Sequence, residues 1–136
     1  MIKIAICDDQ KEYLDTAKNL ITQYGAEKDV PFDITEFSNP SDLLDETVEY
    51  DIYLLDVCMP GITGMSLATE LRAKRIESPI VFLTSYSDYA VQAFGVNATH
   101  YIVKPYTKEE FFNGVDKALA AININSPKTI KLKIEG

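Results

Sequence analysis

Three short runs of almost uninterrupted apolar residues constrain the fold of this chain more than any other feature of its sequence. They read IKIAIC at 2–7, DIYLLD at 51–56 and PIVFLT at 79–84. A strand with one face in solvent alternates apolar and polar residues, whereas a strand covered on both faces is apolar throughout. The three runs therefore indicate central strands of a parallel sheet that helices cover on both faces.

Two further runs, PFDITEF at 31–37 and THYIVK at 99–104, complete five candidate strands, and helical patterns separate them. Five such units in 136 residues favour an α/β fold. We expect a doubly wound five-stranded parallel sheet of flavodoxin-like order 2-1-3-4-5 with helices on both faces. Several helix starts carry recognisable signals. They are Asp9 with Glu12, Asn39 with Pro40, Gly64 before a helix over 65–75, Ser87 with Asp88, and Thr107 with Glu110.

Composition narrows the class of protein. The net charge of −8 disfavours direct binding to nucleic acid by the bulk of the chain. No apolar run approaches the roughly 20 residues that span a bilayer, so no membrane partner is expected. Cys7 and Cys58 are far apart and form no CxxC pattern, which argues against a disulfide scaffold or a zinc site. A cytoplasmic protein fits these features best.

The C-terminal segment differs from the rest of the chain. Residues 123–127 form a polar linker with a proline, and the following KTIKLKIEG at 128–136 alternates apolar residues with lysines, as a strand does. A frayed tail or an added edge strand would explain it. We favour one domain at 1–122 and the start of a truncated second domain at 128–136.

Polar residues follow four of the predicted strands. In an open parallel sheet, ligands bind beyond the carboxyl ends of the strands, where the winding reverses. In the order 2-1-3-4-5 this point lies between strands 1 and 3, and the four strand ends are expected to open onto one crevice. Their residues are Asp8 and Asp9, Asp56, Thr84 and Ser85, and Lys104 before Pro105.

These residue types suit one kind of chemistry. Neighbouring carboxylates repel each other, and oxygen ligands at this density suit Mg²⁺, which also accepts phosphate oxygens. Lys104 adds a positive charge and Thr84 a hydroxyl, so the set fits phosphoryl transfer with Asp56 as the nucleophile. Taken singly, each residue has an ordinary explanation. Asp9 could be a helix N-cap, Asp8 a solvated loop acid, and Asp56 with Lys104 a simple ion pair.

The segments ICDDQ, LLDVCMPGITG, FLTSY and YIVKP resemble the motifs of the receiver domain of two-component response regulators. The resemblance runs from about residue 2 to 121. Residues 82–106 look more specifically like receivers of the LytTR group, whose second domain binds DNA, and the tail is similar to the opening strand of such a domain. This resemblance implies a phosphoacceptor that catalyses its own phosphorylation and dephosphorylation, rather than an enzyme with a separate substrate.

The resemblance also implies roles for single residues. Asp56 would accept the phosphoryl group from a phosphohistidine of a sensor histidine kinase. Thr84, Lys104 and the backbone N–H of Ser85 would bind the phosphoryl oxygens, and Pro105 would follow a cis peptide bond. The cofactor would be Mg²⁺, held by a set of four ligands. They are Asp8, Asp9, Asp56 and the backbone carbonyl of Cys58.

A switch is implied as well. Thr84 would move towards the phosphoryl group, and Tyr101 would rotate into the space that it leaves. The face formed by the helix expected after Ser87, the strand at 99–104 and the helix expected after Thr107 would then change, which would favour a homodimer and control DNA binding through the second domain. Cys58 and Tyr86 occupy positions that influence hydrolysis of the acyl phosphate in this family. Neither would orient an attacking water, so a long-lived phosphoryl group is expected.

Other proteins with a strand-end aspartate remain alternatives. A haloacid-dehalogenase-like phosphatase needs a second aspartate two residues after the nucleophile, where this chain has Cys58. An FMN carrier needs a phosphate-binding loop after strand 1, where CDDQ would repel a phosphate. A pseudo-receiver, a pure interaction module without phosphorylation, is disfavoured by the complete set of acids, hydroxyl and amine.

Overall fold

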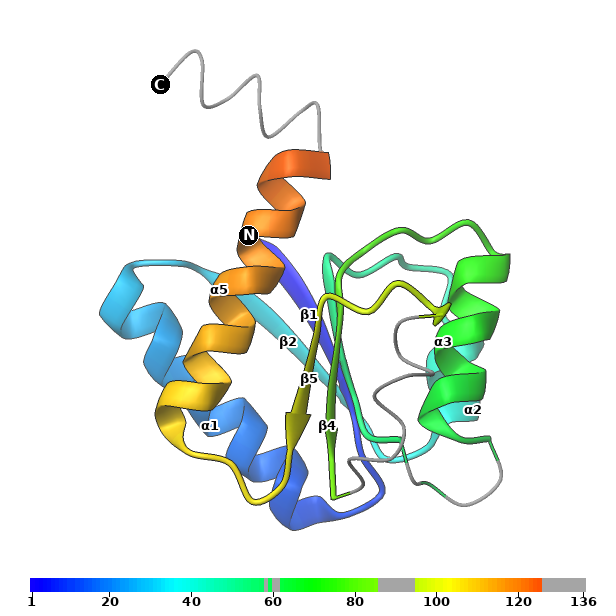
Figure 1. The fold of residues 1–136 in the computed structure, drawn as a ribbon, viewed down its shortest axis with the longest axis horizontal. Helices are drawn as coiled ribbons and strands as arrows, with labels where there is room; N and C mark the ends of the chain where they lie inside the picture. Colours follow the sequence, from blue (N-terminus) through cyan, green and yellow to red (C-terminus); the bar gives the residue numbers. More distant parts are fainter. Residues whose placement is uncertain (58, 60–61, 86–94, 126–136) are drawn as a thin grey trace.

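The computed structural model describes residues 1–57, 59, 62–85 and 95–125, and its centre is a five-stranded parallel sheet (Figure 1). The strand order β2-β1-β3-β4-β5 and the parallel direction of every neighbouring pair confirm the fold expected from the sequence. The strands are β1 (Ile2–Cys7), β2 (Phe32–Phe37), β3 (Ile52–Leu55), β4 (Ile80–Thr84) and β5 (His100–Val103).

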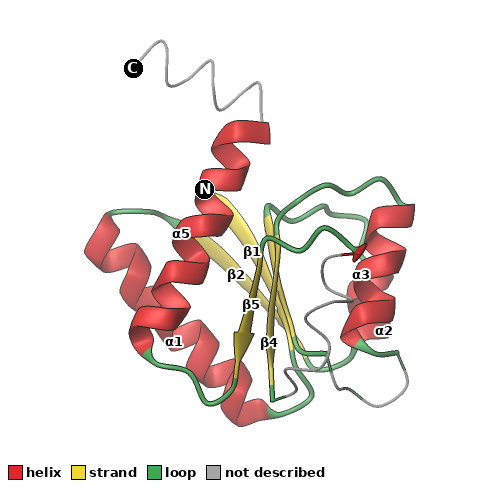
Figure 2. Cartoon of the chain, in the orientation of Figure 1, coloured by secondary structure: helices red, strands yellow, loops and turns green. Residues whose placement is uncertain are grey.

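Helices cover both faces of this sheet (Figure 2). One face carries α1 (Lys11–Lys28) and α5 (Lys108–Asn125), and the other carries α2 (Pro40–Leu44) and α3 (Gly64–Ala73). Helix α5 runs to Asn125, three residues into the segment expected to be a linker. None of the helices in the described part of the chain is long and apolar enough to cross a membrane.

The apolar runs are uninterrupted because each strand contributes to two cores. In β1, Ile4 and Ile6 pack with α1 and α5, whereas Ala5 and Cys7 pack with α2 and α3. The same alternation divides the residues of β3 between the two clusters. Successive residues of a strand point to opposite faces, so a central strand needs an apolar residue at every position.

Two of the expected helix starts are confirmed as predicted. The Asn39 side chain accepts a hydrogen bond from the Ser41 N–H at 2.8 Å, with Pro40 as the first residue of α2. Thr107 and Glu110 form the reciprocal hydrogen bonds of a capping box, at 3.1 and 3.2 Å. Helix α3 begins at Gly64 itself, one residue earlier than expected.

The helix start proposed for Asp9 with Glu12 is wrong. The N-cap of α1 is Gln10, which makes no capping hydrogen bond through its side chain. Instead the Asp8 Oδ1 atom accepts a hydrogen bond from the Gln10 N–H at 2.9 Å. The Asp9 carboxylate is exposed and lies within reach of those of Asp8 and Asp56. The start proposed at Ser87 and Asp88, together with Tyr89 and Phe94, lies outside the described residues.

Candidate functional site

The carboxyl ends of the parallel strands meet at one edge of the sheet, at the bottom of Figure 1. Asp8 directly follows β1 and Asp56 directly follows β3, and these two strands are neighbours. Backbone hydrogen bonds continue the sheet to these residues, since the Asp56 N–H donates to the Cys7 carbonyl at 3.0 Å and the Asp8 N–H donates to the Phe37 carbonyl at 3.0 Å. Both acids are therefore fixed by the rigid part of the fold.

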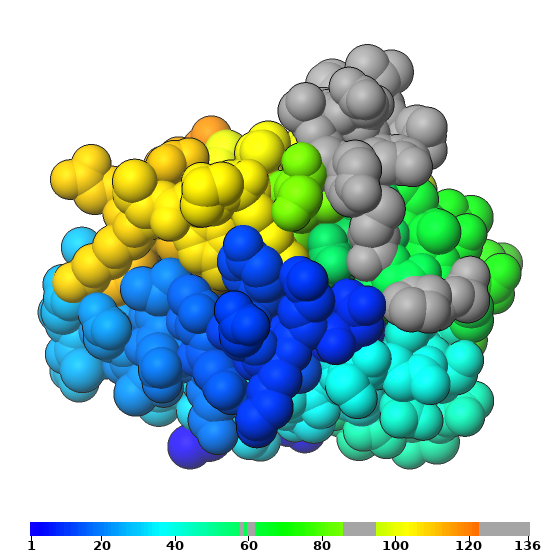
Figure 3. Space-filling model, turned by 90° about the horizontal axis from the view of Figure 1, so that it is seen from below, coloured from blue at the N-terminus to red at the C-terminus, as the bar shows by residue number. Residues whose placement is uncertain are grey.

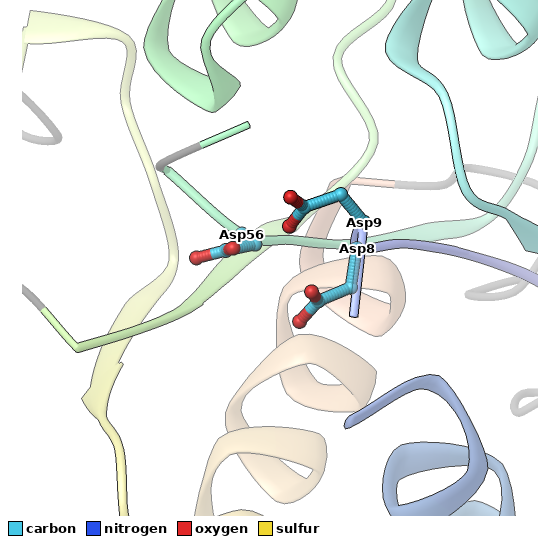
Figure 4. A group of neighbouring side chains, drawn as sticks. All are labelled: Asp8, Asp9 and Asp56. Atoms are coloured by element: carbon cyan, nitrogen blue, oxygen red, sulfur yellow. The ribbon is translucent and has the colours of Figure 1, made fainter. Parts of the chain in front are cut away.

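Three carboxylates gather at this edge. Asp8, Asp9 and Asp56 can each offer one oxygen so that all three atoms lie within 4.8 Å of one another. Figure 4 shows the three side chains extending to the same side of the two strand ends. Asp8 and Asp56 are only 4% and 5% exposed, whereas Asp9 is open to solvent. The cluster thus has two buried ligands and one exposed ligand.

Lys104 brings a positive charge to the two buried acids. Its Nζ atom lies 2.7 Å from Asp8 Oδ2 and 3.8 Å from Asp56 Oδ2. The lysine directly follows β5, its N–H donates to the Thr84 carbonyl at 2.7 Å, and its peptide bond to Pro105 is cis. Figure 3 looks onto this edge and shows the blue segment that follows β1 beside the yellow segment that follows β5.

The donor set at this edge fits a hard divalent cation. Its three carboxylates supply only oxygen ligands, which Mg²⁺ prefers, and one exposed ligand leaves room for water or a phosphate oxygen. Both carboxylate oxygens of Asp8 already have partners. Its Oδ1 accepts a hydrogen bond from the Gln10 N–H, and its Oδ2 pairs with Lys104. A bound cation would therefore compete with Lys104 for Asp8.

The remaining predicted residues lie at or near the same edge, as far as the structure describes them. Thr84 ends β4 and is fully buried, and Ser85 follows it and is exposed. Tyr101 on β5 is half-buried, with its ring centroid 6.0 Å from that of Phe82. Cys58 and Tyr86, predicted as a carbonyl ligand and as residues that tune hydrolysis, lie outside the described residues.

The sequence reasoning missed the aromatic surroundings of the lysine. The Lys104 Nζ atom lies over the ring of Tyr13, 3.7 Å from its centroid, and Tyr13 belongs to the first turn of α1. Tyr106 packs beside Tyr13, with ring centroids 6.5 Å apart. The only signal in the sequence was an aromatic residue one helical turn after the acid pair, which is also a common core pattern.

Gly64 is a second residue whose role at the site the sequence did not reveal. A Cβ atom at this position would collide with the backbone carbonyl of Asp56 and lie 2.8 Å from the Val57 Cα atom. The Gly64 N–H donates to the Val57 carbonyl at 2.8 Å. The start of α3 therefore supports the backbone of Asp56 at a distance that only glycine allows.

Burial and the nearby acids raise the pKa values of two neighbouring groups, Cys7 and Tyr106. Burial, with the charges of Asp8 and Asp56 as the next largest causes, raises the pKa of the Cys7 thiol to about 12. Burial and the charge of Asp8 raise the pKa of Tyr106 to about 12. Both groups are therefore neutral near pH 7, and neither adds negative charge to the cluster.

Comparisons with known proteins agree on one family. A family model described as "Response regulator receiver domain" matches residues 4–116. The sensory transduction protein LytT of Oceanobacillus iheyensis is 32% identical over 98% of this chain, and the transcriptional regulatory protein LytR of Staphylococcus aureus is 31% identical over 88%. The aligned parts are 55% and 48% of those proteins, so the chain spans about half their length.

Solved structures give the same result at the level of the fold. The response regulatory domain of mrkE from Klebsiella pneumoniae has a TM-score of 0.79 and 27% identity, over 88% of this chain and 97% of that one. The response regulator TrrA of Thermotoga maritima, solved in complex with Mg²⁺ and BeF, has a TM-score of 0.75 and 29% identity, over 87% of this chain and 99% of that one.

Proposed function

The chain belongs to the family of response regulator receiver domains of two-component systems, and we propose that its Asp56 accepts a phosphoryl group from the phosphohistidine of a sensor histidine kinase. One observation carries this proposal. A buried ammonium, Lys104, lies 2.7 Å from Asp8 and 3.8 Å from Asp56 at the edge where three carboxylates meet. This is the charge arrangement that phosphoryl transfer requires.

The proposed transfer exchanges one bond to phosphorus for another. A carboxylate oxygen of Asp56 attacks the phosphorus atom, and an O–P bond forms while the N–P bond of the phosphohistidine breaks. The electron pair of the broken bond stays on the imidazole nitrogen, which then takes up a proton. Attack by water on the acyl phosphate later releases inorganic phosphate and restores Asp56.

Several groups of this chain would bind the phosphoryl oxygens or a metal ion. Asp8, Asp9 and Asp56 would hold Mg²⁺, which supplies positive charge to the phosphoryl oxygens when it is bound. Lys104 would exchange its contact with Asp8 for a phosphoryl oxygen. The Thr84 hydroxyl and the Ser85 backbone N–H would donate to the other oxygens, since Thr84 ends the neighbouring strand β4 and Ser85 follows it. The proposed contribution of the Cys58 carbonyl falls on a residue that the structure does not describe.

The switch proposed for this domain connects Thr84 with Tyr101. Both lie on adjacent strands, since Thr84 pairs with Val103 in the β4–β5 register. Movement of Thr84 towards the phosphoryl group would change the packing beside the half-buried Tyr101 ring. The face that includes β5 and α5 would then favour a homodimer, and a DNA-binding domain attached after this one would be brought into pairs.

Phosphorylation with a small donor tests the function. The protein is incubated with Mg²⁺ and acetyl phosphate, and its intact mass is followed with time. We expect the mass of one phosphoryl group to be gained by the wild type and by Asp15→Asn, which removes an exposed carboxylate of α1, but not by Asp56→Asn. Reduction with borohydride, which cleaves an acyl phosphate, would locate the modified residue by peptide mapping.

The same experiment separates the alternatives. A haloacid-dehalogenase-like phosphatase would release inorganic phosphate continuously from phosphate esters, and a pseudo-receiver would gain no mass under any condition. A mass gain that persists in Asp56→Asn would contradict the assignment of Asp56.

A further inference from the structure

The ring of Tyr13 contacts the ammonium group that the proposed function needs. Lys104 Nζ lies 3.7 Å from the ring centroid, within the distance at which the face of an aromatic ring attracts a cation. The side chain of Lys104 is only 2% exposed. Cation–π attraction is stronger in such a desolvated position than at an exposed one. The exposed Lys108 provides a contrast, since its Nζ atom lies 5.1 Å from the Phe112 ring.

Neighbouring aromatic residues hold the Tyr13 ring in place. The Tyr106 ring lies 6.5 Å from it, and the Phe111 ring lies 5.6 Å from that of Tyr106, so three rings connect α1 with the start of α5. The Tyr106 hydroxyl is buried without a hydrogen-bond partner among the described residues. A buried hydroxyl without a hydrogen-bond partner costs free energy. The position of the Tyr106 ring is therefore not explained by a hydrogen bond of its hydroxyl.

Asp8 faces two cations in the proposed function. It holds Lys104 at 2.7 Å, yet it also belongs to the cluster that would bind Mg²⁺. When a metal ion takes the Asp8 oxygen, the buried ammonium loses its shortest contact. A buried charge that loses its partner is costly unless another group replaces that partner. The Tyr13 ring can do this, because a neutral ring face is not a metal ligand and does not compete for Mg²⁺.

We propose that Tyr13 is a positioning residue that holds the Lys104 ammonium beside Asp56 while Asp8 is engaged by the metal ion. This inference rests on the proposed function. The chemistry of the contact needs an aromatic face and not the hydroxyl. Tyr13→Phe therefore keeps the positioning, and Tyr13→Leu removes it while keeping an apolar side chain in the first turn of α1.

The rate of phosphorylation by acetyl phosphate at saturating Mg²⁺ tests the proposal. We expect Tyr13→Leu to slow the rate by about 3- to 30-fold, as the loss of a cation–π contact implies, and Tyr13→Phe to keep the rate within about 2-fold. Phe112→Leu removes a ring from a lysine outside the site and is the matched control, with an unchanged rate. Thermal unfolding of each variant shows that the protein remains folded.

A spectroscopic measurement tests the contact without phosphorylation. Protons above an aromatic ring resonate upfield. We therefore expect the Lys104 Hε resonances of the wild type to be shifted upfield, both without and with Mg²⁺. In Tyr13→Leu we expect this upfield shift to be lost. If Mg²⁺ moves these resonances to the position of exposed lysines, the ammonium leaves the ring on metal binding and the proposal is overturned.

The two proposals can fail separately. If the wild type gains no phosphoryl group, the proposed function fails. If the wild type is phosphorylated and Tyr13→Leu reacts at the same rate, only the positioning role fails. Equal losses in Tyr13→Phe and Tyr13→Leu would show that the hydroxyl matters, which also overturns the role of the ring face.

Discussion

Lys104 and its two acids form a buried ionic group at the scale of single residues. The side chains of Lys104, Asp8 and Asp56 are 2%, 5% and 6% exposed, so all three charges are largely removed from water. The desolvation of such charges offsets most of their mutual attraction, and apolar residues of similar size often give a more stable fold. We infer that these charges are retained for the chemistry of the edge and not for stability.

Cys7 allows a prediction about reactivity at the same scale. Its pKa of about 12 means that roughly one thiol in a thousand is ionised at pH 9, and the side chain is 1% exposed. Because the thiolate is the reactive form, we expect iodoacetamide to label Cys7 at least about 100-fold more slowly in the folded protein than in denaturant. Because the thiolate fraction of a thiol well below its pKa rises about tenfold per pH unit, we expect the rate for folded Cys7 to keep rising through pH 9, whereas the rate in denaturant levels off above about pH 8.5.

Peptide mapping after a timed quench separates Cys7 from Cys58 and gives the labelling rate of each. The unfolded protein is the control, because its thiols have ordinary pKa values and label faster as pH rises through about 8.5. Equal labelling of Cys7 in the folded and unfolded protein would mean that the end of β1 opens frequently.

Helix α3 and the end of β3 meet at Gly64, which gives a prediction at the scale of elements. Gly64→Ala would push a methyl group into the backbone of Asp56 and Val57, and backbone cannot yield as a flexible side chain can. We expect a loss of about 1–3 kcal/mol in the free energy of unfolding, as for overpacking, and slower phosphorylation of Asp56 because its carboxylate is displaced. Urea unfolding and the acetyl phosphate assay measure the two effects.

Gly95→Ala is the matched control for this variant. A Cβ atom at Gly95 would meet no heavy atom within 4 Å, so the same chemical change should leave both measurements nearly unchanged. If Gly64→Ala is as stable as Gly95→Ala, the contact between the start of α3 and the Asp56 backbone is looser than the structure indicates.

The helices and strands also show how much of the fold and of the candidate site could be predicted from the sequence. Strand order and both helical layers followed from runs such as 51–56, because burial on two faces leaves a visible apolar pattern. The meeting of Asp8, Asp56 and Lys104 followed from that order, since parallel strands share one edge for their carboxyl ends. The roles of these residues in phosphoryl transfer stay predictions.

Other features could not be read from the sequence for physical reasons. The expected start of α1 was wrong by one residue because two adjacent aspartates precede the helix, and the sequence does not show that Gln10 is the N-cap and that its N–H donates to Asp8. The contact of Tyr13 with Lys104 joins residues 91 positions apart, which no local pattern reports. Gly64 resembled an ordinary helix start, because a close backbone approach leaves no trace in composition.

At the scale of the whole molecule, charge and sheet topology bear on association. Each chain carries a net charge of −8, so two copies repel each other at low salt. At about 0.15 M salt the Debye length is roughly 8 Å, and this repulsion is largely screened. Strand β5 forms one edge of the sheet, and Val103 on it is 39% exposed, so this side of the molecule can accept a partner.

The proposed homodimer yields a prediction for the oligomeric state of this chain after phosphorylation. Phosphorylation would change the face that includes β5 and α5, where Lys117 is exposed, and a two-fold axis can bring this lysine of each copy near an acid of the other. We expect the sedimenting mass to double on treatment with Mg²⁺ and acetyl phosphate at 0.15 M salt (roughly physiological), and to stay that of a monomer in Asp56→Asn. Since a dimer depends on mass action, dilution should reverse it. A fully phosphorylated protein that sediments as a monomer at high concentration would refute dimerisation through this domain, while leaving the phosphorylation of Asp56 intact.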